Sequence, residues 1–465
     1  MHLERLEITG LRGFAKTECL ELAIPNGKFG SGITILVGPN NAGKSTIVEA
    51  FTTLSRSDPQ DGHYGSSISR DKRNERAGSR VHLQAVVQGG EVSELKTIEA
   101  GGALTETLGW NIGAFVVPSR RIFHPFFERF PEYMARSTYA SQGDHPSLRS
   151  STLDRINERI FSAHGGRDRF NAVLAKVVGP VPDWNIEQTE DGRYYLQFRF
   201  GNSVHSSDGL GDGLLSVWLI IDALYDSSKG EIIVIDEPEQ SLHPSMQKRL
   251  FSLLGEHAKD RQIVYATHSP YFLNWAAVFN GARVTRVWKK EDRSVLSALK
   301  IETSDRLRGI ARNLNNPHVL GLNAGEVFFL EDKVVLVEGQ EDVVFYHLIG
   351  EQISREMPGD FFGWGVGGAG NMAHIAQMLV DLGFERVVGI LDKDKEGLKP
   401  GLDSRFPQFK FFVIPAPDVR TKEAKPESAE VTGLVDARGK LRDDYKAAVE
   451  KMFDQIAVIL TGSRI

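Results

Sequence analysis

Short, wholly apolar runs recur along the chain, and polar or glycine-rich residues follow them. Ile33–Val37, Glu231–Asp236 and Gln262–Ala266 contain such runs, which are typical of strands buried on both faces of a parallel sheet. Thr46–Phe51 and Leu214–Leu224 have the apolar spacing of helices. Further strands are predicted as two or three within residues 1–37, and at Val81–Val87, Phe115–Val117 and Tyr194–Phe200.

A second series of strands and helices begins near residue 326. Strands are predicted at Lys333–Val337, Gly363–Gly370, Arg386–Leu391 and Phe409–Ile414, and helices at Val343–Ile349 and Met372–Leu382. We therefore expect an α/β protein with two domains, 1–325 and 326–465, each containing a parallel sheet. A charged, mainly helical stretch at about 119–190 is predicted to be a lobe inserted into the first domain.

Composition limits the classes of protein to be considered. The 465 residues carry a net charge of −6, so any DNA contact must come from local basic patches. The single cysteine, Cys19, excludes an internal disulfide and a thiolate zinc cluster, and it suits a reducing cytoplasm. No apolar run approaches 18 residues, no signal-peptide core is seen at the start, and no heptad run predicts a long coiled coil.

The first apolar strand leads into a phosphate-binding motif. Gly38–Ser45 reads GPNNAGKS and fits G-x-x-x-x-G-K-[ST] at every defined position. Strand before and helix after are the context in which this motif binds a nucleoside triphosphate with Mg²⁺. Lys44 would reach the β- and γ-phosphates, and the Ser45 hydroxyl would bind Mg²⁺. The predicted nucleotide-binding residues here are Gly38, Asn40, Asn41, Ala42, Gly43, Lys44, Ser45 and Thr46.

Three later segments could complete an ATPase site. Ser207 and Gly209 precede a helix, and a hydroxyl with N–H groups at a helix start can hold phosphate. Asp236 and Glu237 end a strand, where one acid near Mg²⁺ and one to polarise water suit phosphoryl hydrolysis. His268 follows the next strand and could contact the γ-phosphate. Each feature alone is more often a turn or a core residue, but their order and spacing favour a site.

The second domain has its own acidic strand ends. Glu338 follows one predicted strand, Asp342 lies four residues later, and Asp392 and Asp394 follow another strand. Carboxyl ends of parallel strands share one sheet edge, and hard carboxylate oxygens favour Mg²⁺ or Mn²⁺. Basic candidates are Lys422 or Lys425 for developing phosphate charge, and Arg306, Arg308 and Arg312 for guiding DNA; each has solvated surface charge as its alternative.

The first 325 residues or so resemble the ABC-type ATPase heads of SMC, recombination-mediator and overcoming-lysogenization-defect (OLD) proteins. The start, Leu11–Phe14, is similar to theirs, and Ser241–Pro244 takes the place of a D-loop. Two features depart from the pattern: the signature is not L-S-G-G-Q, and the Q-loop is not located, with Gln84 and Gln88 as candidates. The missing coiled coil argues against an SMC protein.

The second domain resembles a TOPRIM domain, in which metal held by these acids cuts or joins phosphodiesters. The resemblance makes Glu338 a metal ligand or general base, Asp392 and Asp394 metal ligands, and Asp342 an outer ligand. An ABC-type head followed by TOPRIM is the order of OLD-family ATP-dependent nucleases. This implies a cytoplasmic, ATP-hydrolysing, Mg²⁺- or Mn²⁺-dependent DNA endonuclease that forms a head-to-head dimer or higher oligomer.

The resemblance further implies a role in bacterial defence against phage, sometimes beside a separate defence-system protein. The alternative is an ATP-dependent assembly scaffold or sensor with an inactive TOPRIM domain that controls a separate effector. A primase or topoisomerase would share the acids, but no tyrosine is clearly placed as a nucleophile and no zinc-binding motif is present.

Overall fold

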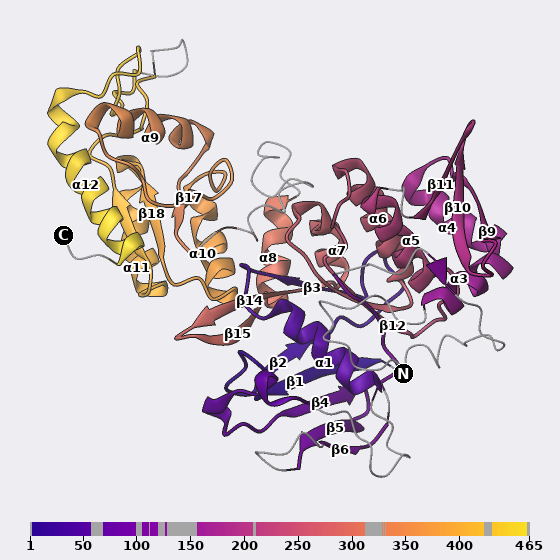
Figure 1. Ribbon diagram of the computed structural model, residues 1–465. Helices are drawn as coiled ribbons and strands as arrows, with labels where there is room; N and C mark the ends of the chain where they lie inside the picture. The colour runs from indigo at the N-terminus through magenta and orange to yellow at the C-terminus, as the bar shows by residue number, and fades with distance from the viewer. Residues whose placement is uncertain are drawn as a thin grey trace. The chain divides into compact units, whose positions relative to one another are not determined.

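The computed structural model describes residues 2–56, 68–98, 105–110, 112–119, 126–127, 156–207, 211–311, 328, 330, 332–422 and 430–462. The chain forms two compact units, Met1–Ala298 and Leu299–Ile465 (Figure 1). The domain boundary predicted near 325 falls outside the described residues, and the first helix after Ala298 packs within the second unit. The functional boundary at 325 therefore stays a prediction.

The main sheet of the first unit is built on the predicted apolar strands. Its order is β15-β14-β3-β13-β12-β7, and only β15 runs antiparallel to its neighbour. All residues of β3, β12 and β13 are buried, which is why these strands read as continuous apolar runs. The bounds are β3 Ile33–Val37, β7 Phe115–Val117, β12 Ile232–Asp236, β13 Gln262–Ala266, β14 Arg283–Lys290 and β15 Arg293–Ala298.

A second, antiparallel sheet in this unit has the order β2-β1-β4-β5-β6. Buried and more exposed residues alternate along β1, as expected for a sheet with one face on the core. The strands β5 and β6 were not predicted, because their charged residues hide the alternation. The bounds are β1 Leu3–Thr9, β2 Glu18–Glu21, β4 His82–Val87, β5 Val92–Thr97 and β6 Thr105–Leu108.

Outside the lobe, the helices of the first unit include the two predicted from apolar spacing. Those two are α1 Lys44–Arg56, which begins within the phosphate-binding motif, and α5 Asp212–Tyr225. The others are α6 Pro244–His257 and α7 Trp275–Asn280. Ten of the fourteen residues of α5 are buried, so this helix lies inside the unit rather than on its surface.

The inserted lobe contains the expected helices and also an antiparallel sheet. Its elements are α3 Ile156–Gly165, α4 Arg167–Val178, β8 Phe126–Phe127, β9 Asp183–Gln188, β10 Tyr194–Phe200 and β11 Ser203–Ser206. Arg159 of α3, 1% exposed, donates from Nε and Nη2 to the Asp222 carboxylate of α5 at 3.1 and 3.0 Å. A buried bidentate pair of this kind fixes the orientation of α3 on α5.

The second unit has a parallel sheet in the order β17-β16-β18-β19, as predicted. Helices α9 and α12 share one core with alternate residues of β16 and β18. Gly389 of β18 faces Met372 of α10 on the other side. The bounds are β16 Val334–Leu336, β17 Asp360–Phe361, β18 Val387–Leu391, β19 Lys410–Val413, α8 Ile301–Ala311, α9 Gln340–Ile353, α10 Met372–Asp381, α11 Lys399–Arg405 and α12 Asp443–Thr461.

One predicted strand is displaced. The segment Gly363–Gly370 was expected to be the second strand, but the strand is Asp360–Phe361 and the glycine-rich segment is the loop after it. Four of its glycines have positive φ angles, a conformation that does not continue a strand. The glycines therefore mark the loop at the sheet edge and not the strand itself.

Candidate functional site

The phosphate-binding loop leaves β3 in a conformation that only glycine adopts easily. Gly38 has φ +132° and Gly43 has φ +119°. A Cβ atom at Gly38 would lie 2.0 Å from the carbonyl oxygen of Val287 on β14. The two glycines of the motif are thus required by backbone angle and, at Gly38, by close packing against a neighbouring strand.

The buried Lys44 side chain donates hydrogen bonds to the backbone of this loop. This side chain is 5% exposed, and Nζ donates to the carbonyl oxygens of Gly38 at 2.8 Å and Pro39 at 3.0 Å. These bonds hold the ammonium group at the start of α1, where helix N–H groups already favour an anion. A phosphate group would find both sources of positive charge at one place.

A cavity of about 500 Å³ opens beside this loop. Among the predicted residues, it is lined by Asn41, Gly43, Ser45, Thr46 and Asp236. The Ser45 hydroxyl and the Asp236 carboxylate therefore face the same space although 191 positions separate them in the sequence. Hydroxyl and carboxylate oxygens fit the Mg²⁺ that accompanies a nucleotide.

Sequence reasoning missed five charged residues that line the same cavity, and three of them form ion pairs with one another. Glu49 of α1 accepts from Arg12 Nε at 2.7 Å and from Lys72 Nζ at 2.8 Å. Burial alone would raise the pKa of Glu49, but the bonds from Arg12 and Lys72 and their charges outweigh it and lower that pKa. The only available signal was Leu11–Phe14, which contains Arg12 but does not reveal its partner.

The acids after β12 and the histidine after β13 lie at adjacent strand ends. Asp236 pairs with Ala266 in the sheet, and Glu237 N donates to the Ala266 carbonyl at 2.9 Å. Glu239 spans the gap: its carboxylate accepts from Thr267 Oγ1 at 2.8 Å and from His268 N at 2.5 Å. Glu239 was not among the predicted site residues, yet it holds the two strand ends together.

Charged groups of the phosphate-binding site shift the pKa of His268. Partial burial lowers its pKa, the Lys44 charge lowers it further, and the Asp236 carboxylate opposes both. The structure thus brings His268, Lys44 and Asp236 within electrostatic reach of one another, as the order of motifs predicted. A neutral imidazole at this strand end can donate one hydrogen bond to a phosphate oxygen.

The signature-like segment lies elsewhere. Ser207 is 3% exposed, does not line the 500 Å³ cavity, and its Oγ atom has no hydrogen-bond partner among the described residues. Gly209 lies outside the described residues. Gly213, in the first turn of α5, packs on the D-loop, since a Cβ atom there would lie 2.5 Å from the carbonyl oxygen of Ser241. The two Q-loop candidates, Gln84 and Gln88, do not line the cavity either.

In the second unit, two predicted acids meet directly at the carboxyl edge of the sheet. Glu338, after β16, accepts through Oε1 from the backbone N–H of Asp392 at 2.9 Å. The Asp342 carboxylate, in the first turn of α9, accepts from Gly339 N at 2.9 Å. Burial and the neighbouring Glu338 carboxylate raise the pKa of Asp342 to about 6, against a lowering by the Gly339 bond. Burial and the carboxylates of Asp342 and Glu338 raise the pKa of Asp392 to about 8.

A further acid, Asp418, lies close to these carboxylates, although it was not among the predicted site residues. Its charge raises the pKa values of Asp342 and Asp392. Lys422 donates to Asp418, and Lys395 donates to Asp394 at 2.7 Å. Lys422 is thus placed at the acidic edge, as one prediction had it, while Lys425 lies outside the described residues.

The acidic edge is not a closed metal site as it stands. Within the described ranges, no group of three or more His, Cys, Asp or Glu side chains is arranged to hold a metal ion. The donor chemistry nevertheless fits a hard divalent cation, because all candidate donors are carboxylate oxygens whose mutual repulsion a cation would relieve. We call Glu338, Asp342, Asp392, Asp394 and Asp418 the acidic edge below.

Family models and one curated protein match parts of this chain. A family model described as "AAA domain, putative AbiEii toxin, Type IV TA system" matches residues 91–274, and one described as "AAA domain" matches residues 5–101. The curated OLD nuclease of Thermus scotoductus is 33% identical over 156 residues. Most of the first unit is therefore similar to AAA domains, and a part of the chain is similar to an OLD nuclease. The match covers 32% of this chain and 29% of that nuclease, so the chain matches under a third of its relative's length.

Solved structures similar to this chain include SMC heads. The SMC head domain from Thermotoga maritima has a TM-score of 0.37 and 15% identity, and covers 65% of this chain and 100% of its own. An Smc head domain from Pyrococcus furiosus, bound to the C-terminal domain of ScpA, has a TM-score of 0.43 and 12% identity, and covers 67% and 100%. These scores are low, and no conclusion about this chain rests on them.

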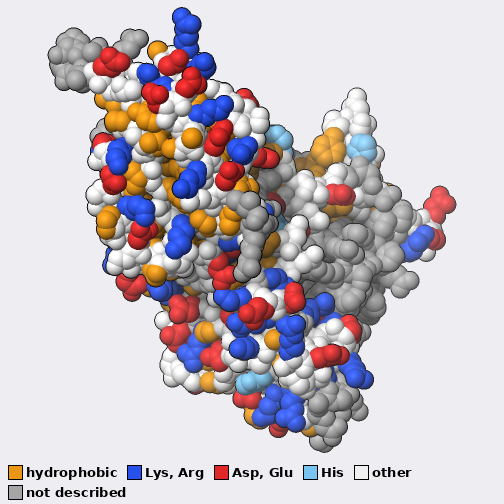
Figure 2. All heavy atoms as spheres, turned by 90° about the vertical axis from the view of Figure 1, so that its left-hand side faces the viewer, with side chains coloured by type: hydrophobic (Ala, Val, Ile, Leu, Met, Phe, Trp, Pro, Cys, Tyr) orange, Lys and Arg blue, Asp and Glu red, His pale blue; other side chains and the backbone are white. Residues whose placement is uncertain are grey.

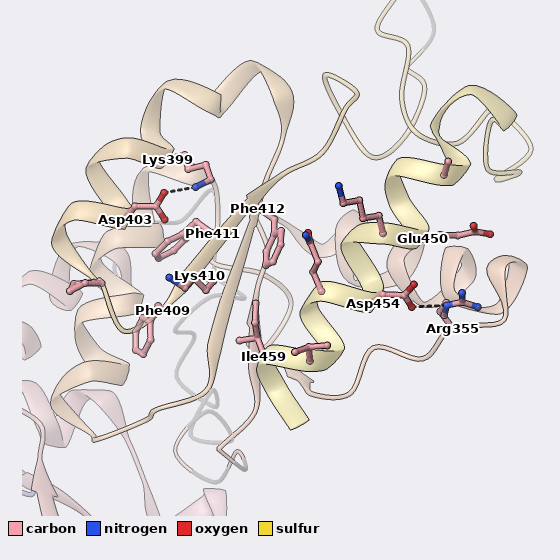
Figure 3. A pocket seen from close by; sticks show the side chains of 15 residues that line it. Arg355, Lys399, Asp403, Phe409, Lys410, Phe411, Phe412, Glu450, Asp454 and Ile459 are labelled. Atoms are coloured by element: carbon pink, nitrogen blue, oxygen red, sulfur yellow. Dashed lines mark hydrogen bonds and ion pairs between the residues drawn. The ribbon is translucent and has the colours of Figure 1, made fainter. Parts of the chain in front are cut away.

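A second cavity, of about 980 Å³, contains none of the predicted site residues. It lies in the second unit beside the edge strand β19 and between α11 and α12 (Figure 3). The ion pairs Arg355–Asp454, at 2.8 Å, and Lys399–Asp403 stand on its rim, around Phe409 and Ile459. The face of this unit turned toward the viewer in Figure 2 likewise mixes hydrophobic and charged side chains.

The basic residues predicted to guide DNA are only partly described. Arg306 is exposed on α8, and Arg308 pairs with Asp305 at 3.2 Å within the same helix. Arg312 lies outside the described residues. In the part of the chain that the structure describes, no helix is long and apolar enough to cross a membrane.

Proposed function

We propose that this chain is an OLD-family protein: an ATP-hydrolysing, divalent-metal-dependent DNA endonuclease that acts in bacterial defence against phage. The observation that carries the proposal is the meeting of Glu338 and Asp392 at the carboxyl edge of a parallel sheet, in a unit separate from the nucleotide site. Nucleotide binding and DNA cleavage would then use different residues on different sheets.

In the ATPase half, each residue has a role that its position supports. Lys44 would neutralise phosphate charge at the start of α1, while Ser45 and Asp236 would hold Mg²⁺ in the shared cavity. Glu237 would accept the proton of the attacking water, and His268 would hydrogen-bond the γ-phosphate. Glu239 would keep these two groups in register, because it bonds the strand end that carries His268.

In the nuclease half, Mg²⁺ or Mn²⁺ bound at the acidic edge would supply Lewis acidity and an activated water. Glu338 would orient the Asp392 loop through its bond to the backbone N–H and share the cation with Asp392 and Asp394. Asp342 would stay an outer ligand, since it accepts from Gly339 N. Lys422 would lower the negative charge of the edge when phosphate arrives.

We further propose that two ATPase heads associate around ATP. By the family resemblance, Ser207 and Gly209 would contact the nucleotide held by a second copy; Ser207 does not line its own chain's cavity. A helix start with a hydroxyl can bind phosphate across such an interface. A separate defence-system protein is a second proposed partner, supported by the family resemblance alone.

The second candidate is an ATP-driven scaffold or sensor that passes its signal to another effector. The observation that favours it is the open geometry of the acidic edge, where the described side chains do not form a ready-made metal site. The two candidates differ in one respect that can be measured: only the nuclease cuts DNA by itself.

The test is cleavage of supercoiled plasmid by the purified chain in Mg²⁺ and in Mn²⁺, with and without ATP. Replacing Asp392 by Asn removes one charge at nearly constant volume, and we expect cleavage to fall on the order of 100-fold or more. Asp403→Asn is the matched control, since Asp403 lies on α11 at the other cavity and should leave cleavage unchanged. If the wild type does not cut, or Asp392→Asn cuts equally well, the scaffold is the better account.

A further inference from the structure

The second unit exposes one large aromatic side chain next to the acidic edge. Trp364 is 56% exposed, whereas the other five tryptophans are buried or half-buried. Single exposed apolar residues are common and need no explanation by themselves. Trp364 differs because of the loop that carries it and the site beside that loop.

The loop after β17 is fixed by its backbone. Gly365 N donates to the Phe362 carbonyl at 3.1 Å, which closes a turn with Trp364 inside it. Asn371 Nδ2 donates to the carbonyls of Val366 and Gly367 at 3.1 and 3.0 Å. A side chain on a rigid turn loses little conformational freedom when a ligand packs on it.

The same loop rests on the strand end that carries Glu338. Gly368 N donates to the Glu338 carbonyl at 2.7 Å, and Val366 N donates to the Val337 carbonyl at 2.8 Å. A Cβ atom at Gly365 would lie 2.6 Å from Gly339 Cα, so the loop touches the backbone next to Glu338. Trp364 is therefore one residue away from a backbone contact with Gly339, the chain neighbour of Glu338.

The negative charge of the acidic edge opposes the binding of phosphate groups, so a contact made by the uncharged Trp364 ring would help to bind nucleic acid. The nearby cations are already engaged with acids: Lys395 with Asp394, Arg420 with Glu341 at 2.9 Å, and Lys422 with Asp418. Phosphate groups approaching the acidic edge meet a net negative field. A base that stacks on an aromatic ring gains contact that this field does not weaken.

From the exposed ring, the fixed loop and its place at the acidic edge, we propose that Trp364 is a stacking platform for a nucleobase of the bound nucleic acid. The proposal rests on the nuclease function proposed above. An unpaired base, at a strand end or in a single-stranded segment, has the open face that such stacking requires. Trp364 would hold the substrate strand while the acids act on its backbone.

The experiment measures how full-length variants bind a fluorescein-labelled oligothymidylate of roughly 15 nucleotides in Ca²⁺. Trp364→Ala should raise the dissociation constant roughly 5- to 100-fold, the effect of losing one stacked base. Trp364→Phe should restore most of the affinity, because the ring still stacks. Phe200→Ala, at an exposed aromatic of the lobe, is the matched control and should bind like the wild type.

Tryptophan emission gives a readout that a purely structural role would not change. The oligonucleotide should quench the emission of the wild type and of Phe200→Ala, but not that of Trp364→Phe. A dissociation constant for Trp364→Ala within about twofold of wild type overturns the proposal, as does absence of binding by the wild type. If Trp364→Ala instead dissociates an oligomer seen by sedimentation, the surface contacts protein and the proposal is also wrong.

Failure here is distinguishable from failure of the nuclease function. Plasmid cleavage by the wild type with equal oligonucleotide binding by Trp364→Ala would remove only the stacking role. Binding that depends on Trp364 without any cleavage would remove the nuclease function and retain the stacking role.

Discussion

Glu237 and Glu239 stand two residues apart in one loop, yet their surroundings assign them different tasks. Glu237 has φ +52°, a left-handed angle that is uncommon for a residue other than glycine and that often marks functional sites. Both carboxylate oxygens of Glu239 already accept hydrogen bonds, from Thr267 and His268. Under the proposed function, Glu237 would be the general base and Glu239 a positioning residue.

Replacing Glu237 by Gln should separate ATP binding from hydrolysis. The variant keeps shape but cannot take a proton, so we expect ATP to bind normally while turnover falls roughly 100-fold or more. Bound ATP that persists should also favour a dimer. Sedimentation with and without ATP measures the second effect, and a steady-state phosphate-release assay measures the first.

Glu239→Gln is the comparison for this prediction, because the same change is made two residues away. If Glu239→Gln binds ATP without hydrolysing it while Glu237→Gln turns over normally, the two assignments must be exchanged. A monomer of Glu237→Gln in both conditions would contradict association of two heads by this chain alone.

At the residue scale, sequence predicted what lies within a motif and missed what joins motifs. Gly38, Lys44 and Ser45 could be assigned because strand, glycines and helix follow one another in the chain. Glu239 acts through a partner 28 positions away, Thr267, and Asp418 acts on Asp342 and Asp392, which precede it on other elements. No local pattern distinguishes such an acid from a solvated one, so only the folded chain reveals it.

At the scale of elements, the lobe helix α4 packs on α6 and partly shields a histidine. His257 is the last residue of α6, and burial, the Arg261 charge and the Lys176 charge of α4 lower its pKa to about 4. Asp260 and Glu256 oppose this shift. The packed helices therefore favour the neutral imidazole.

This shift predicts how stability depends on pH. The folded pKa of about 4 lies below the ordinary value of 6.5, so the unfolded chain binds more protons between these values. Stability contributed by neutral His257 is therefore complete above about pH 6.5 and falls as the pH is lowered toward 4, by at most ~2 kcal/mol at pH 5. Denaturant unfolding of wild type and His257→Gln at pH 7 and pH 5 measures it.

His257→Gln should lose less stability than the wild type between the two pH values, because its side chain does not titrate. Equal losses in both proteins would show that α4 and α6 do not shield His257. Comparison of each protein with itself at pH 7 removes the effect of the substitution on packing.

Elements with a strong pattern were predicted well, and those without one were not. The strand Gln262–Ala266 was predicted to the residue, since a buried parallel strand is apolar throughout. The strands β5 and β6 were missed because charged residues dilute their alternation. The second strand of the second unit was predicted too far along the chain. The glycines of 363–368, on which that prediction rested, belong to the loop that carries Trp364.

At the scale of the molecule, the α/β class and the two parallel sheets follow from the recurrence of apolar runs. Each unit has its own buried cluster, so each sheet and its carboxyl edge can be considered separately. The residues of α8 fall within the range 1–325 predicted for the first domain, and a hydrogen bond from Thr303 to the buried Asp381 attaches this helix to α10. A polar contact across 78 positions leaves no trace in the local pattern.

The central claim is that one chain carries an ATPase site and a separate nuclease site. The most direct test measures ATP hydrolysis and plasmid cleavage in the same preparation of Glu338→Gln. The amide introduced by this substitution would keep an oxygen for the Asp392 N–H and lose only the charge, so the fold should persist. We expect wild-type ATP turnover with cleavage abolished, and Lys44→Ala to lose ATP turnover. Wild-type cleavage by Glu338→Gln, or loss of both activities together, would contradict the account.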